Sequence, residues 1–327
     1  MTDRPALVRV VRNGLQESEH DVHVAVADQD GALVAHAGDA RRIVFARSSM
    51  KPLQAAVGLA HIRARLSDRH VALMCASHNG EAVHVRIVRS LLAAGGLDES
   101  ALGNTPGWPL DREAAARAGG PSRIRHNCSG KHAGMVVASA FAGWPVETYV
   151  RPSHPLQERI LDAVRSASAV DDVAVGVDGC GAPVFGLPLV AMATVFARLA
   201  RPERLGDLEP QVARATAAMR ANPYLVAGRG REDTAVMETA PNLVVKSGAE
   251  ALICAADVER GVGVAVKVAD GGDRAAAPAL LRSLEVLDVL SSTQMRALDR
   301  YARPWVTGGG GPVGRLETEV PLILDRR

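Results

Sequence analysis

Aromatic residues, cysteines and long apolar runs are all scarce in this chain of 327 residues. Aromatics make up only 3% of it, so few side chains are available to stack against nucleic-acid bases. The net charge is +2 and the Lys and Arg residues are dispersed, unlike the basic stripe of a polyanion-binding protein. The longest apolar stretch, about 133–146, is shorter than the roughly 20 residues that span a bilayer. We therefore expect neither a nucleic-acid nor a membrane partner.

The four cysteines are too few in a chain of this length to form a disulfide framework. The N-terminus lacks the apolar core and small-residue cleavage site of a secretory signal. These two observations predict a cytoplasmic protein with free or metal-bound thiols. With 47% hydrophobic and 23% charged residues, the chain can bury a sizeable core.

Strand-like patterns gather at the two ends of the chain, whereas helical patterns dominate its middle. This arrangement predicts an α+β fold in which residues 1–327 form a single catalytic unit. The expected sheet is mixed or antiparallel and is built from both chain ends, about 1–76 and 241–327. A mainly helical region, about 82–240, is inserted between them. The glycine-rich stretch 308–311 is expected to lie in a tail.

Three short motifs in chain order point to serine chemistry. Ser48-Ser-Met-Lys51 is Ser-x-x-Lys at the start of a predicted helix, which the serine pair would cap. Ser77-His-Asn is Ser-x-Asn after a buried segment, and Lys246-Ser-Gly ends a predicted strand. Together they are the three signatures of active-site serine acyl-transfer enzymes. Taken singly, each also fits a helix cap, a surface lysine or a turn.

The spacing gives the lysines a physical role. Residues three apart share a helix face, so Lys51 can lie beside the hydroxyl of Ser48. A lysine accepts a serine proton only after desolvation or a second cation has lowered its pKa. Lys246 is a candidate for that second cation, or for a partner of Ser77.

Residues 123–135 form a polar loop that feeds a predicted buried helix and hold several metal-ligating side chains. Cys128 lies on this loop, and Cys180 lies on a distant loop beside Asp178. Two cysteines with an imidazole form an ordinary zinc site, which nominates Cys128 and Cys180 with His126 or His132. Buried structural cysteines are the alternative.

Four longer motifs closely resemble the rhizobial-type L-asparaginases, also called asparaginase II-like. They are Arg-Ser-Ser-Met-Lys-Pro-Leu-Gln (47–54), Cys-Ala-Ser-His-Asn-Gly-Glu (75–81), His-Asn-Cys-Ser-Gly-Lys-His-Ala-Gly-Met (126–135) and Asp-Gly-Cys-Gly-Ala-Pro (178–183). The resemblance implies a fold similar to serine β-lactamases and serine-dependent glutaminases. It also implies hydrolysis of L-asparagine to L-aspartate and ammonia, usually by a homodimer.

The family's site implies two Ser-Lys tandems, Ser48 with Lys51 and Ser77 with Lys246. Lys267 is a rival for the last position, although it sits within an alternating strand. The family's zinc site replaces the histidine nominated above with a lysine. The implied zinc ligands are Cys128, Lys131 and Cys180, and the implied substrate-binding residues are Arg47, His78, Asn79, Gly80, Glu81 and Asp178.

Other functions share parts of this pattern. A serine-dependent glutaminase or another acyl-serine hydrolase, including one that acts on a β-lactam, would need the same motifs. A zinc-dependent hydrolase would use the metal to activate water. A zinc-stabilised binding module would need the metal site alone.

Overall fold

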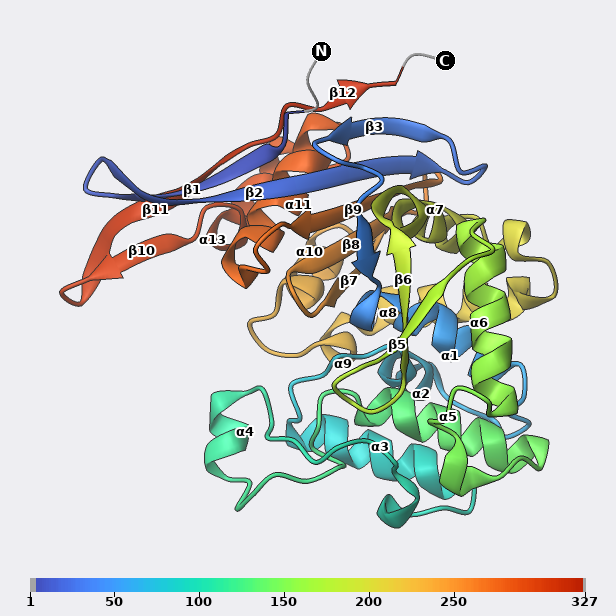
Figure 1. The fold of residues 1–327 in the computed structure, drawn as a ribbon. Coiled ribbons are helices and arrows are strands. Elements are labelled where there is room, and N and C mark those ends of the chain that lie inside the picture. Colours follow the sequence, from blue (N-terminus) through green and yellow to red (C-terminus); the bar gives the residue numbers. More distant parts are fainter. Residues whose placement is uncertain (1–3, 326–327) are drawn as a thin grey trace. The chain divides into compact units, whose positions relative to one another are not determined.

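The computed structural model describes residues 4–325, which divide into two compact units. The sheet unit comprises residues up to Ser49, Leu187–Arg201 and the chain from Ala235 onward. The helical unit comprises Met50–Gly186 and Pro202–Thr234. Figure 1 shows the strands and helices of both units.

A nine-stranded sheet forms the sheet unit, with the order β10-β11-β1-β2-β9-β8-β7, β3 beside β2, and β12 beside β3. The pairs of this sheet are antiparallel. Its strands are β1 (Ala6–Arg12), β2 (Leu15–Asp28), β3 (Leu33–Ala37), β7 (Leu243–Gly248), β8 (Leu252–Asp257), β9 (Val262–Val268), β10 (Trp305–Gly308), β11 (Gly311–Glu319) and β12 (Ile323–Leu324). The short strand β4 (Ile43–Phe45) belongs to the same unit.

Helices pack against the central strands of this sheet. α7 (Leu189–Ala200) contacts β2, β8 and β9, and α11 (Ala276–Val286) contacts β8, β9 and β11. Gly263 on β9 permits the close approach of α7, because a Cβ there would lie 1.9 Å from the carbonyl oxygen of Ala193. The unit also holds α12 (Ser292–Ala297) and α13 (Asp299–Ala302), while α10 (Glu232–Thr239) begins in the helical unit.

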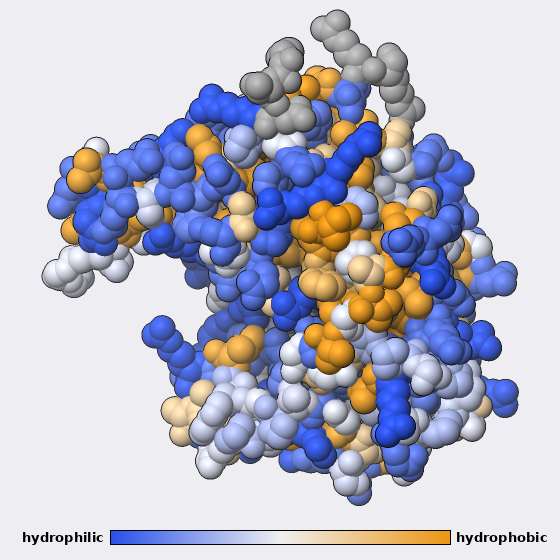
Figure 2. Space-filling model, viewed as in Figure 1, coloured by the Kyte–Doolittle hydropathy of each residue, from blue (hydrophilic) through white to orange (hydrophobic). Residues whose placement is uncertain are grey.

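The helical unit is organised around α1 (Lys51–Leu59), whose nine residues are all buried. α5 (Ser129–Ala142), α6 (Pro155–Ser168) and α8 (Glu209–Ala221) pack against it. The other helices are α2 (Asp68–Met74), α3 (Ala82–Ala94), α4 (Arg112–Ala116) and α9 (Pro223–Val226). β5 (Ala174–Val177) pairs with β6 (Pro183–Pro188) in a hairpin. Apolar surface gathers over this hairpin (Figure 2), where Val177 is 77% exposed.

The predicted α+β class and the antiparallel sheet built from both chain ends are confirmed. The boundaries differ from the expected ones. The sheet unit stops at Ser49 rather than near residue 76, because 51–59 and 68–74 are helical, and α7 joins the sheet from the middle of the chain. The glycines at 308–311 are not a tail but the turn of the β10–β11 hairpin. That the two units act as one catalytic unit stays a prediction.

Candidate active site

In the sheet unit, the segment that opens with Arg47 lies beside the end of β7. Arg47 has a φ of 45°, a left-handed conformation that is uncommon outside glycine. The hydroxyl of Ser49 donates a hydrogen bond to the carbonyl oxygen of Lys246 at 3.0 Å. Gly248 keeps this approach open, because a Cβ there would come within 3.1 Å of the Ser49 hydroxyl. Two of the predicted motifs, Arg-Ser-Ser and Lys-Ser-Gly, therefore meet in this unit.

The predicted helix cap is wrong, and the contacts of Lys246 bear on the choice between Lys246 and Lys267. The serine pair does not cap α1, whose N-cap residue is Met50 and has no side-chain cap bond. Lys246 is fully buried, and its Nζ donates to the carbonyl oxygen of Ser247 at 2.8 Å. Its rival Lys267 lies half-buried on β9, where its Nζ bonds the carbonyl oxygen of Val268. Of the two lysines, Lys246 is the one whose backbone meets the 47–49 segment.

In the helical unit, Lys51 bonds Ser77. The Nζ of Lys51 donates to the Ser77 hydroxyl and to the carbonyl oxygen of Ala76, each at 2.8 Å. Only 1% of Lys51 is exposed. Burial lowers its pKa, against the opposing attraction of Cys128, because the charged ammonium is poorly solvated there. A buried lysine with a lowered pKa beside a serine hydroxyl is a candidate general base.

Backbone hydrogen bonds hold the Ser77 loop rigidly. The Ser77 N–H donates to the carbonyl oxygen of Val226 at 2.9 Å, and the Asn79 N–H donates to that of Ala227 at 2.7 Å. From the other side, the guanidinium of Arg231 donates to the Ser77 carbonyl oxygen at 3.3 Å. These contacts fix the hydroxyl of Ser77 in front of Lys51, as preorganised catalysis requires.

The predicted substrate-binding residues 78–81 make contacts within the unit. His78 is fully buried, accepts the Gly80 N–H at Nδ1 and bonds the Ser129 hydroxyl through Nε2 at 2.9 Å. Burial holds the pKa of His78 well below its usual range, so the ring is neutral. The carboxylate of Glu81 accepts hydrogen bonds from the Tyr224 hydroxyl at 2.5 Å and from the Arg229 N–H at 3.2 Å. These contacts tie the 77–81 loop to helix α5 and to the 228–231 loop.

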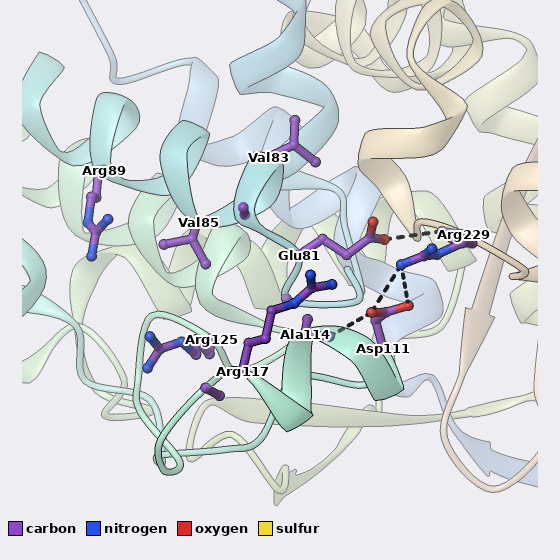
Figure 3. A pocket seen from close by; sticks show the side chains of 12 residues that line it. Glu81, Val83, Val85, Arg89, Asp111, Ala114, Arg117, Arg125 and Arg229 are labelled. Carbon is purple, nitrogen blue, oxygen red and sulfur yellow. Dashed lines mark hydrogen bonds and ion pairs between the residues drawn. The ribbon is translucent and has the colours of Figure 1, made fainter.

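A pocket of about 640 Å³ opens at Gly80 and Glu81 (Figure 3). Its other charged lining residues are Asp111, Arg89, Arg117, Arg125 and Arg229. Arg229 forms ion pairs at the edge of this pocket. Its Nη2 lies 3.2 Å from the carboxylate of Asp111 and 3.1 Å from that of Glu113. Of residues 77–81, only Gly80 and Glu81 line this pocket.

The second cluster joins Cys128, Lys131 and Cys180. α5 begins at Ser129 rather than near residue 135 as expected, so Cys128 is its N-cap and Lys131 lies in its first turn. Gly130 lets this turn press against α2, because a Cβ there would lie 2.3 Å from the carbonyl oxygen of Leu73. The Nζ of Lys131 donates to the Cys180 sulfur at 3.2 Å.

The pKa values of the two thiols shift in opposite directions. A hydrogen bond from Cys180 and the nearby lysine charges lower the pKa of Cys128 well below its usual value. The same bond, together with burial, raises the pKa of Cys180. Burial acts to lower the pKa of Lys131, but the charge on the sulfurs outweighs it and raises that pKa. The lowered pKa of Cys128 favours its thiolate form, and the raised pKa of Lys131 favours an ammonium beside it.

This donor set fits a zinc ion. Two sulfurs and one amine converge, all three residues are at least 96% buried, and thiolate and nitrogen are the ligands that zinc prefers. Among residues 4–325, no group of three or more His, Cys, Asp or Glu could hold a metal. The amine of Lys131, rather than a histidine ring, is the nitrogen that hydrogen-bonds the Cys180 sulfur. The carboxylate of Asp178 lies next to the cluster, 3.8 Å from the Cys180 sulfur.

Sequence reasoning missed several residues of these clusters. Tyr149 and Tyr224 belong to no motif, and their partners lie 17 and 143 positions away in the chain. Ser129 lies within the 126–135 motif, but no role was predicted for it, and its partner His78 lies 51 positions away. Nothing in the sequence indicated that Arg231 would bind the Ser77 carbonyl oxygen. The Lys51–Ser77 bond was missed because helical spacing favoured Ser48 as the partner of Lys51.

Solved structures similar to this chain include three enzymes. A β-lactamase from Mycobacterium bovis is 17% identical, with 86% of this chain and 95% of that chain covered and a TM-score of 0.40. A simvastatin synthase from Aspergillus terreus is 12% identical, with 76% and 84% covered and a TM-score of 0.38. A glutaminase from Bacillus subtilis, in covalent complex with 5-oxo-L-norleucine, is 15% identical, with 87% and 93% covered and a TM-score of 0.36. No curated protein matches the chain.

The comparison with protein families assigns the chain. The sequence model described as L-asparaginase II matches residues 8–318, which is nearly the whole sequence. No helix within residues 4–325 has the length and apolar character to cross a membrane. The chain belongs to the L-asparaginase II family, a family of amidohydrolases.

Proposed function

We propose that this protein hydrolyses the side-chain amide of L-asparagine to L-aspartate and ammonia through a serine ester. The observation that carries the proposal is the buried Lys51, with its lowered pKa and its Nζ 2.8 Å from the Ser77 hydroxyl. Family membership supplies the amide substrate class. A lysine that loses its proton at moderate pH turns an unreactive serine hydroxyl into a nucleophile.

The proposed reaction has two halves. In the first, Ser48 Oγ attacks the side-chain amide carbon while its proton passes to neutral Lys51, and the same proton then leaves with ammonia. In the second, water gives a proton to the lysine and attacks the ester, which releases L-aspartate and restores the Ser48 hydroxyl. The role of Ser48 rests on the Ser-x-x-Lys motif and the family. The hydroxyl of Ser77, bonded to Lys51, relays the proton.

Substrate recognition needs two opposite charges, because asparagine carries an α-ammonium and an α-carboxylate. We propose that Asp178 binds the ammonium and that Arg47 attracts the carboxylate. Residues 78–81 then hold the loop and its pocket rather than the reacting amide, since His78 and Glu81 already use their polar atoms within the unit. Lys246 supplies the second positive charge of the family's tandem.

Zinc is part of the proposal. Cys128, Lys131 and Cys180 would hold the ion, which when bound would supply a fixed positive charge and Lewis acidity. Lys131 and Cys180 must lose their protons to become ligands. We also propose a homodimer in the cytoplasm, from the family resemblance; sedimentation at working concentration tests the dimer.

The test measures ammonia release with Ser48→Ala and Ser77→Ala variants that are shown to be folded. We expect Ser48→Ala to remove activity and the wild-type ester to be trapped by mass spectrometry on the peptide that contains Ser48. The Lys51–Ser77 bond favours a second candidate, in which Ser77 attacks. Normal turnover by Ser48→Ala, with the ester on the Ser77 peptide, would assign the attack to Ser77.

Two further measurements distinguish the asparaginase from a glutaminase and from a zinc-dependent hydrolase. Glutamine differs from asparagine by one methylene, which a pocket discriminates by about 1–3 kcal/mol, so both amides are assayed at equal concentration. Faster turnover of glutamine would make the enzyme a glutaminase. Loss of activity with a chelator, combined with normal activity of both serine variants, would establish a zinc-dependent hydrolase instead.

A further inference from the structure

The direction of the Ser77 side chain is set by the two planar peptide groups that meet at its Cα. In the group before it, the Ala76 carbonyl oxygen accepts a hydrogen bond from Lys51 Nζ at 2.8 Å. The N–H of the same group belongs to Ser77 and donates to the carbonyl oxygen of Val226 at 2.9 Å. Both polar atoms of this peptide group are thus held from outside the 77–81 loop, by α1 and by α9.

The peptide group after Ser77 is held in the same way. Its N–H belongs to His78 and donates to the carbonyl oxygen of Asn127 at 3.1 Å. Its carbonyl oxygen, that of Ser77, accepts a hydrogen bond from Nη1 of Arg231 at 3.3 Å. Two of these four partners are side chains, those of Lys51 and Arg231. Lys51 is the proposed base, whereas Arg231 has no role in the proposed reaction.

The loop that carries Arg231 runs beside Ser77 and Asn79. The Asn79 N–H donates to the carbonyl oxygen of Ala227 at 2.7 Å. Gly228, with a φ of 118°, permits this close approach, because a Cβ there would lie 2.7 Å from the side-chain amide nitrogen of Asn79. These contacts place the backbone of the Arg231 loop, so that the guanidinium reaches the Ser77 carbonyl oxygen.

Two acidic side chains orient the guanidinium of Arg231. Its Nη1 binds Ser77, whereas its Nη2 lies 3.7 Å from the carboxylate of Glu232 and 3.9 Å from that of Asp233. Asp233 is fully buried, and only 23% of the Arg231 side chain is exposed. A planar guanidinium carries its N–H donors in a fixed fork, so one nitrogen can bind an oxygen while another faces a carboxylate. The ammonium of a lysine has no such fork.

We propose that Arg231 is a positioning residue of Ser77. Its guanidinium fixes the peptide group after Ser77, and so keeps the hydroxyl in front of Lys51. The inference rests on the proposed function, in which that hydroxyl relays the proton of Lys51. A hydrogen bond from a charged donor is stronger than one between neutral groups, and a displacement of about 1 Å at a reacting group can lower turnover about 100-fold. Arg231 thus acts on the rate of the reaction rather than on the binding of substrate.

The first experiment needs no substrate. Amide hydrogen exchange of the full chain is followed by mass spectrometry on the peptide that covers residues 75–81. Folded Arg231→Ala should exchange the amides of this peptide about 10-fold faster than the wild type, because a lost hydrogen bond makes local opening easier. The matched control is Arg214→Ala, since Arg214 donates to the carbonyl oxygen of Leu66 in the same unit, and it should leave this exchange unchanged. Wild-type protection of the peptide in Arg231→Ala would overturn the proposal.

The second experiment measures turnover of L-asparagine. We expect Arg231→Ala to lower kcat about 100-fold and to leave KM nearly unchanged, because the residues proposed to bind asparagine lie elsewhere. Added ethylguanidine should restore part of kcat and ethylammonium should not, since only the planar fork can bind the Ser77 oxygen and face the carboxylates together. Arg231→Lys keeps a cation beside the acids and should also lose kcat, which preserves the test should the alanine variant not fold. Arg214→Ala should keep kcat.

The two proposals fail in different ways. If the wild type hydrolyses neither amide, the proposed function falls, and hydrogen exchange still decides whether Arg231 holds the peptide group of Ser77. If the wild type is active and folded Arg231→Ala keeps its kcat, or raises KM alone, the proposed function stands and the positioning role falls.

Discussion

Replacing Lys51 by Met tests the proposed base most directly. Lys51 is the first residue of α1 and is 1% exposed, and its Nζ donates to Ser77 Oγ and to the Ala76 carbonyl oxygen at 2.8 Å each. Methionine has a similar length and no proton to exchange, and it is adaptable in a buried site. The substitution therefore removes the proton acceptor while preserving the volume of the side chain.

The expected loss is large in turnover and small in stability. Removing a general base typically lowers turnover about 10²–10⁴-fold, which corresponds to about 3–5 kcal/mol of transition-state stabilisation. In the folding balance, an Ala76 carbonyl left without its partner costs about 1–3 kcal/mol. Relief from burying an ammonium acts in the opposite direction. We expect kcat to collapse while the midpoint of urea unfolding moves little.

A double-mutant cycle sharpens this prediction. If Lys51 and Ser77 act as one proton-transfer unit, Lys51→Met combined with Ser77→Ala should lose no more activity than the worse single variant, because groups that work together are non-additive. The assay is ammonia release at saturating L-asparagine, with unfolding curves for each variant. Losses that multiply in the double variant, or a Lys51→Met enzyme with near-normal kcat, would show that Lys51 is not the base for this hydroxyl.

Three other predictions concern the surrounding structure. Cys254 should resist alkylation in the folded protein at pH 8, because burial raises its pKa to about 12; peptide mass mapping checks this, and rapid labelling would contradict it. Gly130→Ala should destabilise the protein by about 1–3 kcal/mol through overpacking, since its Cβ would lie 2.3 Å from a backbone oxygen of α2, whereas Gly120→Ala, with open space around it, should be neutral in urea unfolding. Asp270→Asn should flatten the acid side of the stability curve. The backbone N–H of Gly272 and the His20 ring depress the carboxyl pKa, so its contribution is present above the usual value of 3.8 and disappears as pH falls through the lower folded pKa; unchanged acid unfolding would argue against it.

The sequence predicts most of the architecture because the two periodicities differ clearly along the chain. Alternation in β2 and in β7 to β9 predicts strands at both ends, and the apolar spacing after Pro52 predicts α1. The β10–β11 hairpin was missed because the four consecutive glycines that form its turn were interpreted as part of a tail. The predicted boundary between the units was also wrong, because α7 lies in the middle of the chain but packs against β9 in the sheet unit. No local sequence pattern encodes this contact.

The sequence predicts which residues form the candidate site better than it predicts which of their side chains contact one another. Motifs indicate which residues carry chemistry, because the reaction needs a serine, a lysine and thiols at fixed spacing. They do not indicate which lysine faces which hydroxyl, since that depends on the packing of α1 against neighbouring elements. The bond from Lys51 to Ser77 spans 26 positions, and that from Lys131 to Cys180 spans 49.

Different partners give the two buried lysines of the helical unit different tasks. Both are almost fully buried and both lie near the sulfur pair, yet the pKa of Lys51 is lowered whereas that of Lys131 is raised. The difference follows from their partners, because Lys51 donates to a neutral hydroxyl and a carbonyl while Lys131 donates to a sulfur. Titratable neighbours whose environments separate their pKa values in this way are how one site assigns acid and base roles. Lys51 is therefore the lysine suited to accept the serine proton, and Lys131 is suited to remain with the sulfurs, as the cation of the cluster or, once its proton is displaced, as a ligand of the metal.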